Sequence, residues 1–577
     1  MTIAPQSQSQ GQSHGQSNGL DAPLSQPSRP VAHPPHRPRT RLDTHEVGNQ
    51  PEPRGDRDLW AEDGRLQAAV TAAAADYSAD VAAYGAEMGR AETREDGRLA
   101  NRHGPELRVF DAGGRRIDEV SFHPAYHAMM RRGLHAGYAA CAWEEDGRAG
   151  GHVAHTALMY LASQVEPGSC CPMTMTYAAQ PAVRADEGIA ALWGPRLNSR
   201  AYDGRSRPVT EKTGATLGMA MTEKQGGSDV RSNTTRAEPD GADWRLYGHK
   251  WFCSAPMSDG FLTLAHTEAG LTCFLVPRWT PDGERNAIHL MRLKDKLGNR
   301  SNASSEIEYH GAWAQALGAP GDGVRTIVEM VHHTRLDTAT APVAFMRAAL
   351  SEAVWWCRER RAFQKTLIDQ PLMAAVLADI ALDWEGGLAL VMRVAAAFDA
   401  GQKDPEARAF ARLSVALAKY ALNKRCANAI YEAMECLGGA GYVEESPLPL
   451  LYREAPLNSI WEGSGNVICL DVLRTLRREP ASFEMLRAEL AAAKGVDRRY
   501  DAALEAAERR WPRGPEEAEA RWFVERYARL LEASLLLREG APAVSEAFVA
   551  ARLGEDRGAG YGAVGSGADT AAILARI

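Results

Sequence analysis

The sequence contains neither a long apolar run nor a leader-like start. Nowhere in its 577 residues does an uninterrupted apolar stretch approach the roughly 18 to 20 residues of a membrane-spanning helix. The N-terminus also lacks the basic and then apolar order of a signal peptide. We therefore expect a cytoplasmic protein with no membrane segment.

Metal-binding and disulfide motifs are missing as well. No CxxC pair occurs, and His152, His155, His332 and His333 lack the spacing of a zinc site. The nine cysteines are Cys141, Cys170, Cys171, Cys253, Cys273, Cys357, Cys426, Cys436 and Cys469. The adjacent residues Cys170 and Cys171 could form a redox switch, but such cysteines more often serve as small buried apolar side chains. We predict reduced thiols and no bound metal.

The chain has no excess of positive over negative charge. The formal net charge of -8 excludes a protein covered by positive potential, so nucleic-acid binding would need a local basic patch. With 45% hydrophobic and 24% charged residues, the chain has the composition of an ordinary globular protein. Its length predicts several domains.

Changes in residue pattern predict an α+β chain that is mainly α. Residues 1–45 are rich in Gln, Ser and Pro, which predicts a disordered tail. Apolar residues at helical spacing predict an N-terminal helical domain over residues 46–195, and short alternating runs predict a middle β-domain over residues 196–320. Long amphipathic segments predict a C-terminal helical domain over residues 321–477 and a helical extension over residues 478–577.

Three short motifs, far apart in the chain, carry the chemical signal. Residues 221–230 read MTEKQGGSDV, in which paired glycines let backbone amides approach a phosphate and hydroxyls can bond a ring or phosphate oxygen. Residues 250–254 read KWFCS on an expected strand, and residues 461–466 read WEGSGN in an expected turn before a helix. Each motif alone is ordinary, but three matches in this order are hard to attribute to chance.

Together the motifs resemble those of the acyl-CoA dehydrogenase family, in which a T-E-x-x-x-G-S-D loop, a W-I-T strand and a Y-E-G-T turn surround FAD. The resemblance covers about residues 55–475 and implies that family's fold, with the helical extension added. It implies that Thr222 bonds the flavin ring, that Ser228 meets the pyrophosphate, and that Phe252 and Ser254 lie against the ring. The residues it assigns to FAD are Met219, Met221, Thr222, Gly227, Ser228, Phe252, Cys253, Ser254, Arg360, Phe363, Gly438, Gly439, Ile460, Trp461, Glu462, Gly463, Ser464 and Asn466.

Two of these contacts carry a further implication. The run beginning at Arg360 resembles R-x-x-F-G, whose Arg reaches the pyrophosphate of a neighbouring subunit's flavin, although Gln364 here replaces the Gly. The turn at Gly438 and Gly439 resembles the family's L-G-G-x-G turn. Since no strand precedes this turn, we reject a nicotinamide-binding fingerprint there.

Glu462 takes the position of the family's catalytic base. The family reaction removes an α-proton while hydride leaves the β-carbon for the flavin, and it needs a carboxylate shielded from water. The alternative is a turn carboxylate that is stabilised by the dipole of the following helix.

Other runs resemble the adaptive-response (AidB-type) branch of this family. They are TEKQGGSD at residues 222–229, SNTTR at residues 232–236 and LKDKLGNRSNAS at residues 293–304. This resemblance implies a homotetrameric flavoprotein of the DNA alkylation response, with weak dehydrogenase activity on acyl-CoA and a C-terminal extension associated with DNA.

The C-terminal extension is not basic in bulk. From residue 481 onward it has 14 Arg and Lys against 16 Asp and Glu. Arginines nevertheless cluster at Arg498 with Arg499 and at Arg509 with Arg510, and arginine suits bidentate phosphate contact. With Arg474, they are the candidate contacts for sequence-independent binding of double-stranded DNA. The alternative is a solvated helix face with interleaved glutamates.

Three functions remain open from the sequence. The first is an FAD-dependent, acyl-CoA dehydrogenase-like oxidoreductase that uses Glu462, including a metabolic enzyme without a DNA role. The second is a catalytically vestigial flavoprotein that protects DNA. The third is a structural assembly stabilised by flavin.

Overall fold

A computed structural model describes residues 39–554 and 558–577. Residues 39–50 belong to a separate unit, in which Arg41 and Glu46 form an isolated antiparallel bridge. The predicted tail of residues 1–45 therefore falls mostly outside the described residues. The second unit, Pro51–Ile577, contains all the elements below.

The N-terminal part of this unit is helical, but a β-hairpin that the sequence analysis did not predict interrupts it. The hairpin pairs β1 (Glu106–Phe110) with β2 (Arg116–Ser121). The hydrophobic core buries α5 along its whole length. The helices are α1 (Gly64–Ala73), α2 (Ser78–Gly89), α3 (Ala91–Arg102), α4 (Pro124–Ala136), α5 (Gly151–Ser163), α6 (Cys170–Val183) and α7 (Glu187–Leu197), with a 3₁₀ turn η1 (Ala75–Tyr77).

A β-domain follows, as the alternating pattern predicts. Its strands are β3 (Leu217–Ala220), β4 (Arg236–Asp240), β5 (Asp243–Ser254), β6 (Gly260–Thr267), β7 (Gly270–Pro277), β8 (Ile288–Leu293) and β9 (Ser304–Leu317), with 3₁₀ turns η2 (Val209–Glu211) and η3 (Val230–Ser232). The strand order is β3-β6-β4-β5-β9-β7, and β8 pairs with β9. Because β7 pairs with both β6 and β9, the strands from β6 to β7 close on themselves.

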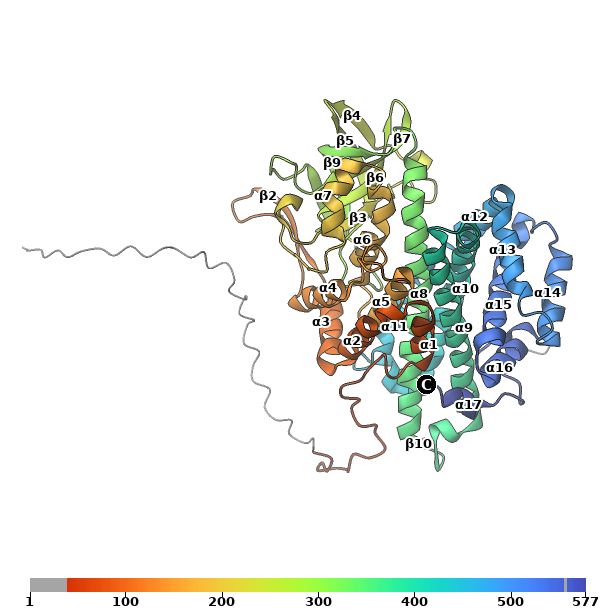
Figure 1. Ribbon diagram of the computed structural model, residues 1–577. Coiled ribbons are helices and arrows are strands. Elements are labelled where there is room, and N and C mark those ends of the chain that lie inside the picture. The colour runs from red at the N-terminus through yellow and green to blue at the C-terminus, as the bar shows by residue number, and fades with distance from the viewer. Residues whose placement is uncertain (1–38, 555–557) are drawn as a thin grey trace, which may run out of the picture. The chain divides into compact units, whose positions relative to one another are not determined.

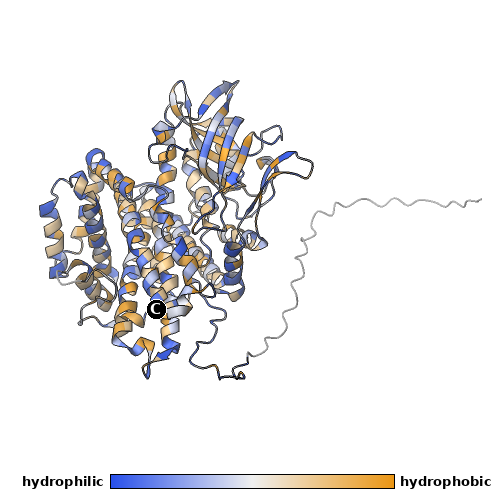
Figure 2. Cartoon of the chain, turned by 180° about the vertical axis from the view of Figure 1, so that it is seen from behind, coloured by the Kyte–Doolittle hydropathy of each residue, from blue (hydrophilic) through white to orange (hydrophobic). Residues whose placement is uncertain are grey.

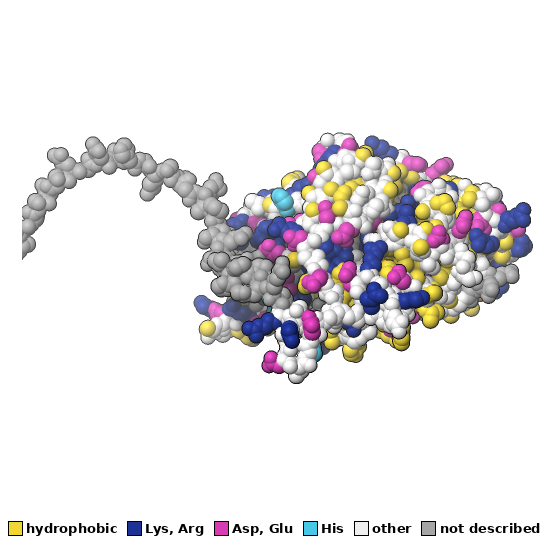
Figure 3. Space-filling model, turned by 90° about the horizontal axis from the view of Figure 1, so that it is seen from below, with side chains coloured by type: hydrophobic (Ala, Val, Ile, Leu, Met, Phe, Trp, Pro, Cys, Tyr) yellow, Lys and Arg dark blue, Asp and Glu magenta, His cyan; other side chains and the backbone are white. Residues whose placement is uncertain are grey.

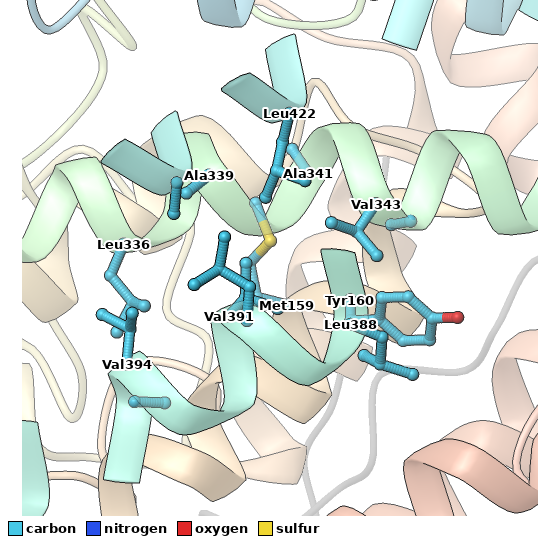
Figure 4. Packing of buried hydrophobic residues seen from close by; sticks show 14 of the residues in the cluster. Met159, Tyr160, Leu336, Ala339, Ala341, Val343, Leu388, Val391, Val394 and Leu422 are labelled. Carbon is cyan, nitrogen blue, oxygen red and sulfur yellow. The ribbon is translucent and has the colours of Figure 1, made fainter. Parts of the chain in front are cut away.

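Three long helices form the centre of the C-terminal half. They are α8 (Gly323–Glu359), α9 (Pro371–Gly401) and α10 (Pro405–Leu437). Figure 4 shows Leu336 of α8 and Val391 and Val394 of α9 packing beside Met159 of α5, with Leu422 of α10 close by. The shorter elements are β10 (Arg361–Ala362), β11 (Lys365–Thr366), η4 (Leu367–Asp369), η5 (Gly438–Tyr442), α11 (Leu448–Glu454), η6 (Leu457–Ser459) and α12 (Gly465–Arg478).

The extension is helical, and it packs along α9 and α10 on the side away from the N-terminal helices (Figure 1). Its elements are α13 (Pro480–Ala491), α14 (Arg498–Arg510), η7 (Glu517–Glu519), α15 (Ala520–Glu539), α16 (Pro542–Leu553) and α17 (Thr570–Leu574). Figure 2 shows polar and apolar residues interleaved along these helices, as expected where one face packs and the other meets water. No helix among the described residues combines the length and apolar character that a bilayer crossing requires.

A buried ion-pair network joins the extension to α9. The carboxylate of Asp383 lies 2.7 Å from Nε of Arg425, 3.0 Å from Nε of Arg552 and 3.4 Å from Nη1 of Arg529. The hydroxyl of Tyr561 donates to it at 2.7 Å. Burial alone would raise the pKa of Asp383, but the charges of the three arginines outweigh it and hold the pKa far below its ordinary value. Two arginines of the extension, Arg529 and Arg552, are therefore committed to the interior.

We expect Asp383→Ala to lower the free energy of unfolding by about 3 to 5 kcal/mol, because it removes the buried carboxylate that Arg425, Arg529 and Arg552 share. Since the pKa of Asp383 is depressed by folding, its contribution should be present above about pH 4 and disappear as the pH falls further. Chemical denaturation at several pH values would measure both effects. Glu546→Ala, which removes an exposed carboxylate of α16, is the control and should change stability by less than about 0.5 kcal/mol. Equal stabilities for the two variants would contradict this role.

Candidate functional site

The first motif is a loop fixed by one buried carboxylate. Glu223 is fully buried, and its Oε1 accepts hydrogen bonds from Nζ of Lys250 at 2.8 Å and from Oγ1 of Thr235 at 2.6 Å. Its Oε2 accepts from the backbone amide of Thr234 at 2.7 Å. Burial raises the pKa of Glu223, but the Lys250 charge and these bonds bring it well below its ordinary value. The loop is thereby tied to β5.

The same loop lies directly beside the second motif. The backbone amide of Trp251 donates to the carbonyl of Thr222 at 2.8 Å. A Cβ on Gly227 would come within 2.3 Å of Oγ1 of Thr222, so glycine is required where the loop folds over that threonine. Phe252 leaves 49% of its surface exposed on β5, whereas Cys253 is buried.

Ser254, at the end of β5, faces a polar cluster. Its hydroxyl lies 3.2 Å from that of Ser304, which also accepts a bond from Nζ of Lys296 at 3.2 Å. Cys171 of α6 joins this cluster. Burial raises the pKa of the Cys171 thiol to about 12 against the charge of Lys296 and hydrogen bonds with Ser254 and Asn302, and the carboxylate of Glu462 adds to the rise.

The third motif places Glu462 in a constrained turn. Its Oε2 accepts a hydrogen bond from Oγ1 of Thr334 on α8 at 2.6 Å. The backbone of Glu462 has a φ of 56°, a left-handed value that costs energy for a residue other than glycine. Burial raises the pKa of its carboxyl, while the Thr334 bond and the charges of Lys419 and Arg335 oppose the rise.

The site therefore forms where three parts of the chain meet. Cys171 comes from the N-terminal helices, Ser254 and Lys296 come from the β-domain, and Glu462 comes from the turn before α12. Ser254 and Glu462 both lie close enough to the Cys171 thiol to influence its pKa, so the second and third motifs come together at this residue.

The remaining residues of the motifs lie near these three points. Met219 lies on β3 and Met221 follows it, both partly buried. In the turn, Nε1 of Trp461 donates to Oδ1 of Asn458 at 2.7 Å, and Ile460 is exposed. The other members keep at least part of their surface accessible, namely Ser228, Gly463, Ser464 and Asn466.

Four predicted FAD residues lie elsewhere. Arg360 and Phe363 follow the end of α8. Arg360 is 26 residues beyond Thr334, which corresponds to about 39 Å at 1.5 Å per residue along this helix. Figure 1 shows β10 at the end of α8 opposite the β-domain. Gly438 and Gly439 are exposed just beyond the end of α10. This end of α10 lies beside the same end of α8, because Sγ of Cys357 contacts the carbonyl of Cys436. These four residues do not join the site of their own chain.

The candidate DNA contacts are all exposed arginines, several of them in ion pairs. Arg499 lies 2.6 Å from Asp497, Arg509 lies 3.4 Å from Glu505, and Arg510 pairs with Glu519. Arg498 is exposed at the start of α14. The side chain of Arg474 on α12 is 63% exposed and stands 3.9 Å from Asp471. Figure 3 likewise shows cationic and anionic side chains interspersed on the face seen from below.

Among the described residues, no group of three or more His, Cys, Asp and Glu side chains is placed to hold a metal ion. The candidate site offers hydroxyls, one carboxylate, a thiol and an ammonium group, which suit an organic ligand.

Comparison with known proteins matches the same three parts. Residues 49–204 match the adaptive response protein AidB N-terminal domain, residues 218–312 the acyl-CoA dehydrogenase middle domain, and residues 321–477 the acyl-CoA dehydrogenase C-terminal domain. The putative acyl-CoA dehydrogenase AidB of Escherichia coli is 49% identical over 80% of this chain and 86% of its own length. The chain belongs to the acyl-CoA dehydrogenase family.

Solved structures of the family agree with this fold. The Caenorhabditis elegans protein ACDH-11, in complex with C11-CoA, is similar with a TM-score of 0.79 and 27% identity over 88% of this chain and 92% of that one. An acyl-CoA dehydrogenase of Bacillus anthracis complexed with FAD has a TM-score of 0.58 at 16% identity, covering 74% and 77% of the two chains, and supports the fold.

Sequence reasoning did not assign the residues that complete the site. Oε2 of Glu454 on α11 accepts from the backbone amide of Asn299 at 2.5 Å, and Oε1 accepts from its side-chain amide at 2.8 Å. Glu166, just before α6, bonds the hydroxyl of Ser301 in the same loop. The sequence run LKDKLGNRSNAS includes this loop, but the two glutamates that bond it, Glu166 and Glu454, lie far away in the sequence. They reach the loop only in the folded chain.

We expect the contribution of Glu454 to stability to be lost as the pH rises from about 4.5 to 7. Burial raises the pKa of Glu454 from 4.5 to about 7, against its bonds to Asn299. Between these values the folded state keeps a proton that the unfolded chain has released, so each pH unit costs up to about 1.4 kcal/mol. Glu454→Gln, which imitates the neutral acid, should flatten this pH dependence in chemical denaturation. An unchanged slope would show that Glu454 does not hold the proton.

Proposed function

We propose that this protein is an FAD-dependent oxidoreductase that acts on acyl-CoA thioesters by α,β-desaturation. The observation that carries the proposal is the convergence of Ser254, Cys171 and Glu462 from three parts of the chain. Family membership supports the oxidoreductase class, and the C11-CoA bound to ACDH-11 supports the ligand class.

FAD is the cofactor, and the exposed parts of the motifs fit it. Thr222 and Ser254 would bond the flavin ring, and Gly227 and Ser228 would meet the pyrophosphate. Phe252 offers an exposed aromatic face next to the loop, where a planar ring could cover it. The glycine at residue 227 keeps the backbone of the loop open to a phosphate.

When bound, FAD supplies the acceptor for the hydride that leaves the β-carbon of the acyl group. Glu462 removes the proton from the α-carbon, and the electron pair of that bond forms the carbon–carbon double bond. Burial makes the Glu462 carboxylate a stronger base than one in water, and the Thr334 hydroxyl holds one of its oxygens. The other oxygen is left for the substrate.

We further propose a homotetramer in which a neighbouring subunit completes the cofactor site. Arg360, Phe363, Gly438 and Gly439 match FAD contacts but lie far from the site of their own chain. Large apolar side chains are exposed at the same end of the helices, with Phe363 at 91%, which supports burial against a second copy. They are Phe363, Leu372, Tyr431, Tyr442 and Val443.

A second proposed function is sequence-independent association with DNA, as part of a protective role in the alkylation response. The observation that favours it is a group of three exposed arginines on α12, formed by Arg474, Arg477 and Arg478. The adjacent Asp471 bonds the inner arginines Arg335 and Arg412 at 2.7 to 3.0 Å, so its charge is already compensated. Positive potential on this helix is therefore less offset than on α14.

We expect an acyl-CoA substrate to bleach the flavin of the wild-type protein under anaerobic conditions. Glu462→Gln should slow this reduction by about 10² to 10⁴, the usual worth of a positioned general base, and should leave the FAD content unchanged. Stopped-flow absorbance with a panel of acyl-CoA chain lengths would measure the rate. If the two proteins are reduced at equal rates, Glu462 is not the base. If none of the panel reduces the wild type, the protein is not an acyl-CoA dehydrogenase for these substrates.

For DNA, we expect Arg474→Ala to weaken duplex binding and to reduce the slope of log affinity against log salt by about 0.9, the contribution of one phosphate contact. Replacing Arg498 and Arg499 by Ala should reduce the slope less than two full contacts, because Asp497 already pairs with Arg499. Fluorescence anisotropy at several salt concentrations measures both slopes. Glu462→Gln is the control, since its side chain bonds Thr334 of α8 at the candidate site and is not part of the arginine group on α12. A wild-type protein that fails to bind duplex DNA at low salt would end the proposal.

A further inference from the structure

Lys419 of α10 is a buried lysine that the chemistry proposed above does not use. Only 2% of it is exposed. Its Nζ donates to the backbone carbonyls of Asn458 at 3.0 Å, Trp461 at 2.9 Å and Gly463 at 2.8 Å. An ammonium group has three N–H donors, and each of them is matched here by one acceptor.

The three carbonyls flank Glu462 on both sides. They belong to a turn with two left-handed residues in succession, Glu462 at a φ of 56° and Gly463 at 99°. Such a turn persists only where its surroundings fix it. The preceding 3₁₀ turn η6 ends at Ser459, and Ser464 is the N-cap residue of α12, so the turn between these two residues belongs to no regular helix. Lys419 supplies the missing donors from a neighbouring helix.

The charged groups around Lys419 affect whether it is an ammonium group with three N–H donors or a neutral amine with two. Burial lowers its pKa to about 7, with Arg335 of α8 and Lys424 of α10 acting in the same sense, while the carboxylate of Glu462 opposes them. A neutral amine has two N–H donors, so one carbonyl would face a lone pair. The same positive charge stabilises the ionised form of Glu462.

From this geometry we infer that Lys419 is a positioning residue for Glu462, which fixes the turn through three carbonyls and favours the carboxylate form of the base. The inference rests on the proposed function for its catalytic consequence. Its structural part, that the ammonium group holds the turn, stands independently of catalysis.

The test compares Lys419→Met with the wild-type holoenzyme. Methionine keeps a similar apolar chain and removes all three donors. Lys424→Met is a matched control on the same helix, since the exposed Lys424 makes one bond of 3.0 Å to the hydroxyl of Ser459. Lys419→Gln is the second variant if methionine prevents folding, because its amide can still donate to two acceptors without charge. FAD content and circular dichroism establish that each variant is folded.

The first readout is hydrogen–deuterium exchange of the segment 457–465. We expect exchange at least about tenfold faster in Lys419→Met or Lys419→Gln, and a much smaller change in Lys424→Met, which loses a single bond to the side chain of Ser459. The second readout is the pH profile of flavin reduction by acyl-CoA. Loss of a nearby positive charge should move the acid limb to higher pH by about one unit, since an opposite charge ordinarily lowers a carboxyl pKa by one to three units.

Unchanged exchange in the Lys419 variants would overturn the inference. Faster exchange with an unmoved acid limb would also overturn the positioning role, leaving Lys419 as a residue that stabilises the fold. If no acyl-CoA reduces the wild-type flavin, the proposed function fails, and the exchange measurement still decides whether Lys419 holds the turn.

Discussion

The candidate site depends on buried carboxylates that bind the loop at residues 294–304 from two sides. Glu166 approaches it from the N-terminal helices and Glu454 from α11, so one β-domain loop is fixed to both helical parts. This loop carries Lys296 and leads into Ser304, which accepts a hydrogen bond from Lys296 and lies beside the hydroxyl of Ser254. Because a buried carboxyl group without partners is costly, the observed packing of the three parts, in which both glutamates have partners, is favoured. The site is a consequence of that constraint.

Much of this arrangement could be predicted from the sequence, because it depends on local pattern. The order of helical, β and helical segments follows from periodicity, and the family and fold are confirmed by the matching domains. The β1 and β2 hairpin was not predicted, because its strands are short and lie between helices of strong pattern. The assignments of single residues to FAD stay predictions, although Thr222, Ser254 and Glu462 do lie in the loop, strand and turn that the motifs indicated.

Long-range contacts account for what the sequence could not supply. The sequence predicts Cys171 to be a small buried side chain, and it is buried. Its closeness to Ser254 and Glu462 follows from the packing of α6 against the β-domain, which no sequence pattern indicates. Lys419 lies in the middle of a helix whose spacing gives no sign of the turn 39 to 44 residues later. In both cases the partner is distant in sequence, and no short motif contains both members.

The arginines of the extension show how a count of charges can mislead. Arg529, Arg552 and Arg576 contribute to the sequence total, yet they pair with Asp383, Asp379 and Glu385 of α9 inside the protein. On α14 the predicted clusters include their own acids, so charge there is compensated within the helix and its neighbours. These buried ion pairs thus hold the extension against α9. The arginines that remain for DNA are those whose neighbouring acid already pairs with buried arginines, as Asp471 does with Arg335 and Arg412. The arginines of α12 meet this condition. Because α12 begins immediately after the turn that contains Glu462, the proposed DNA contacts and the proposed catalytic base lie on adjacent segments of the chain.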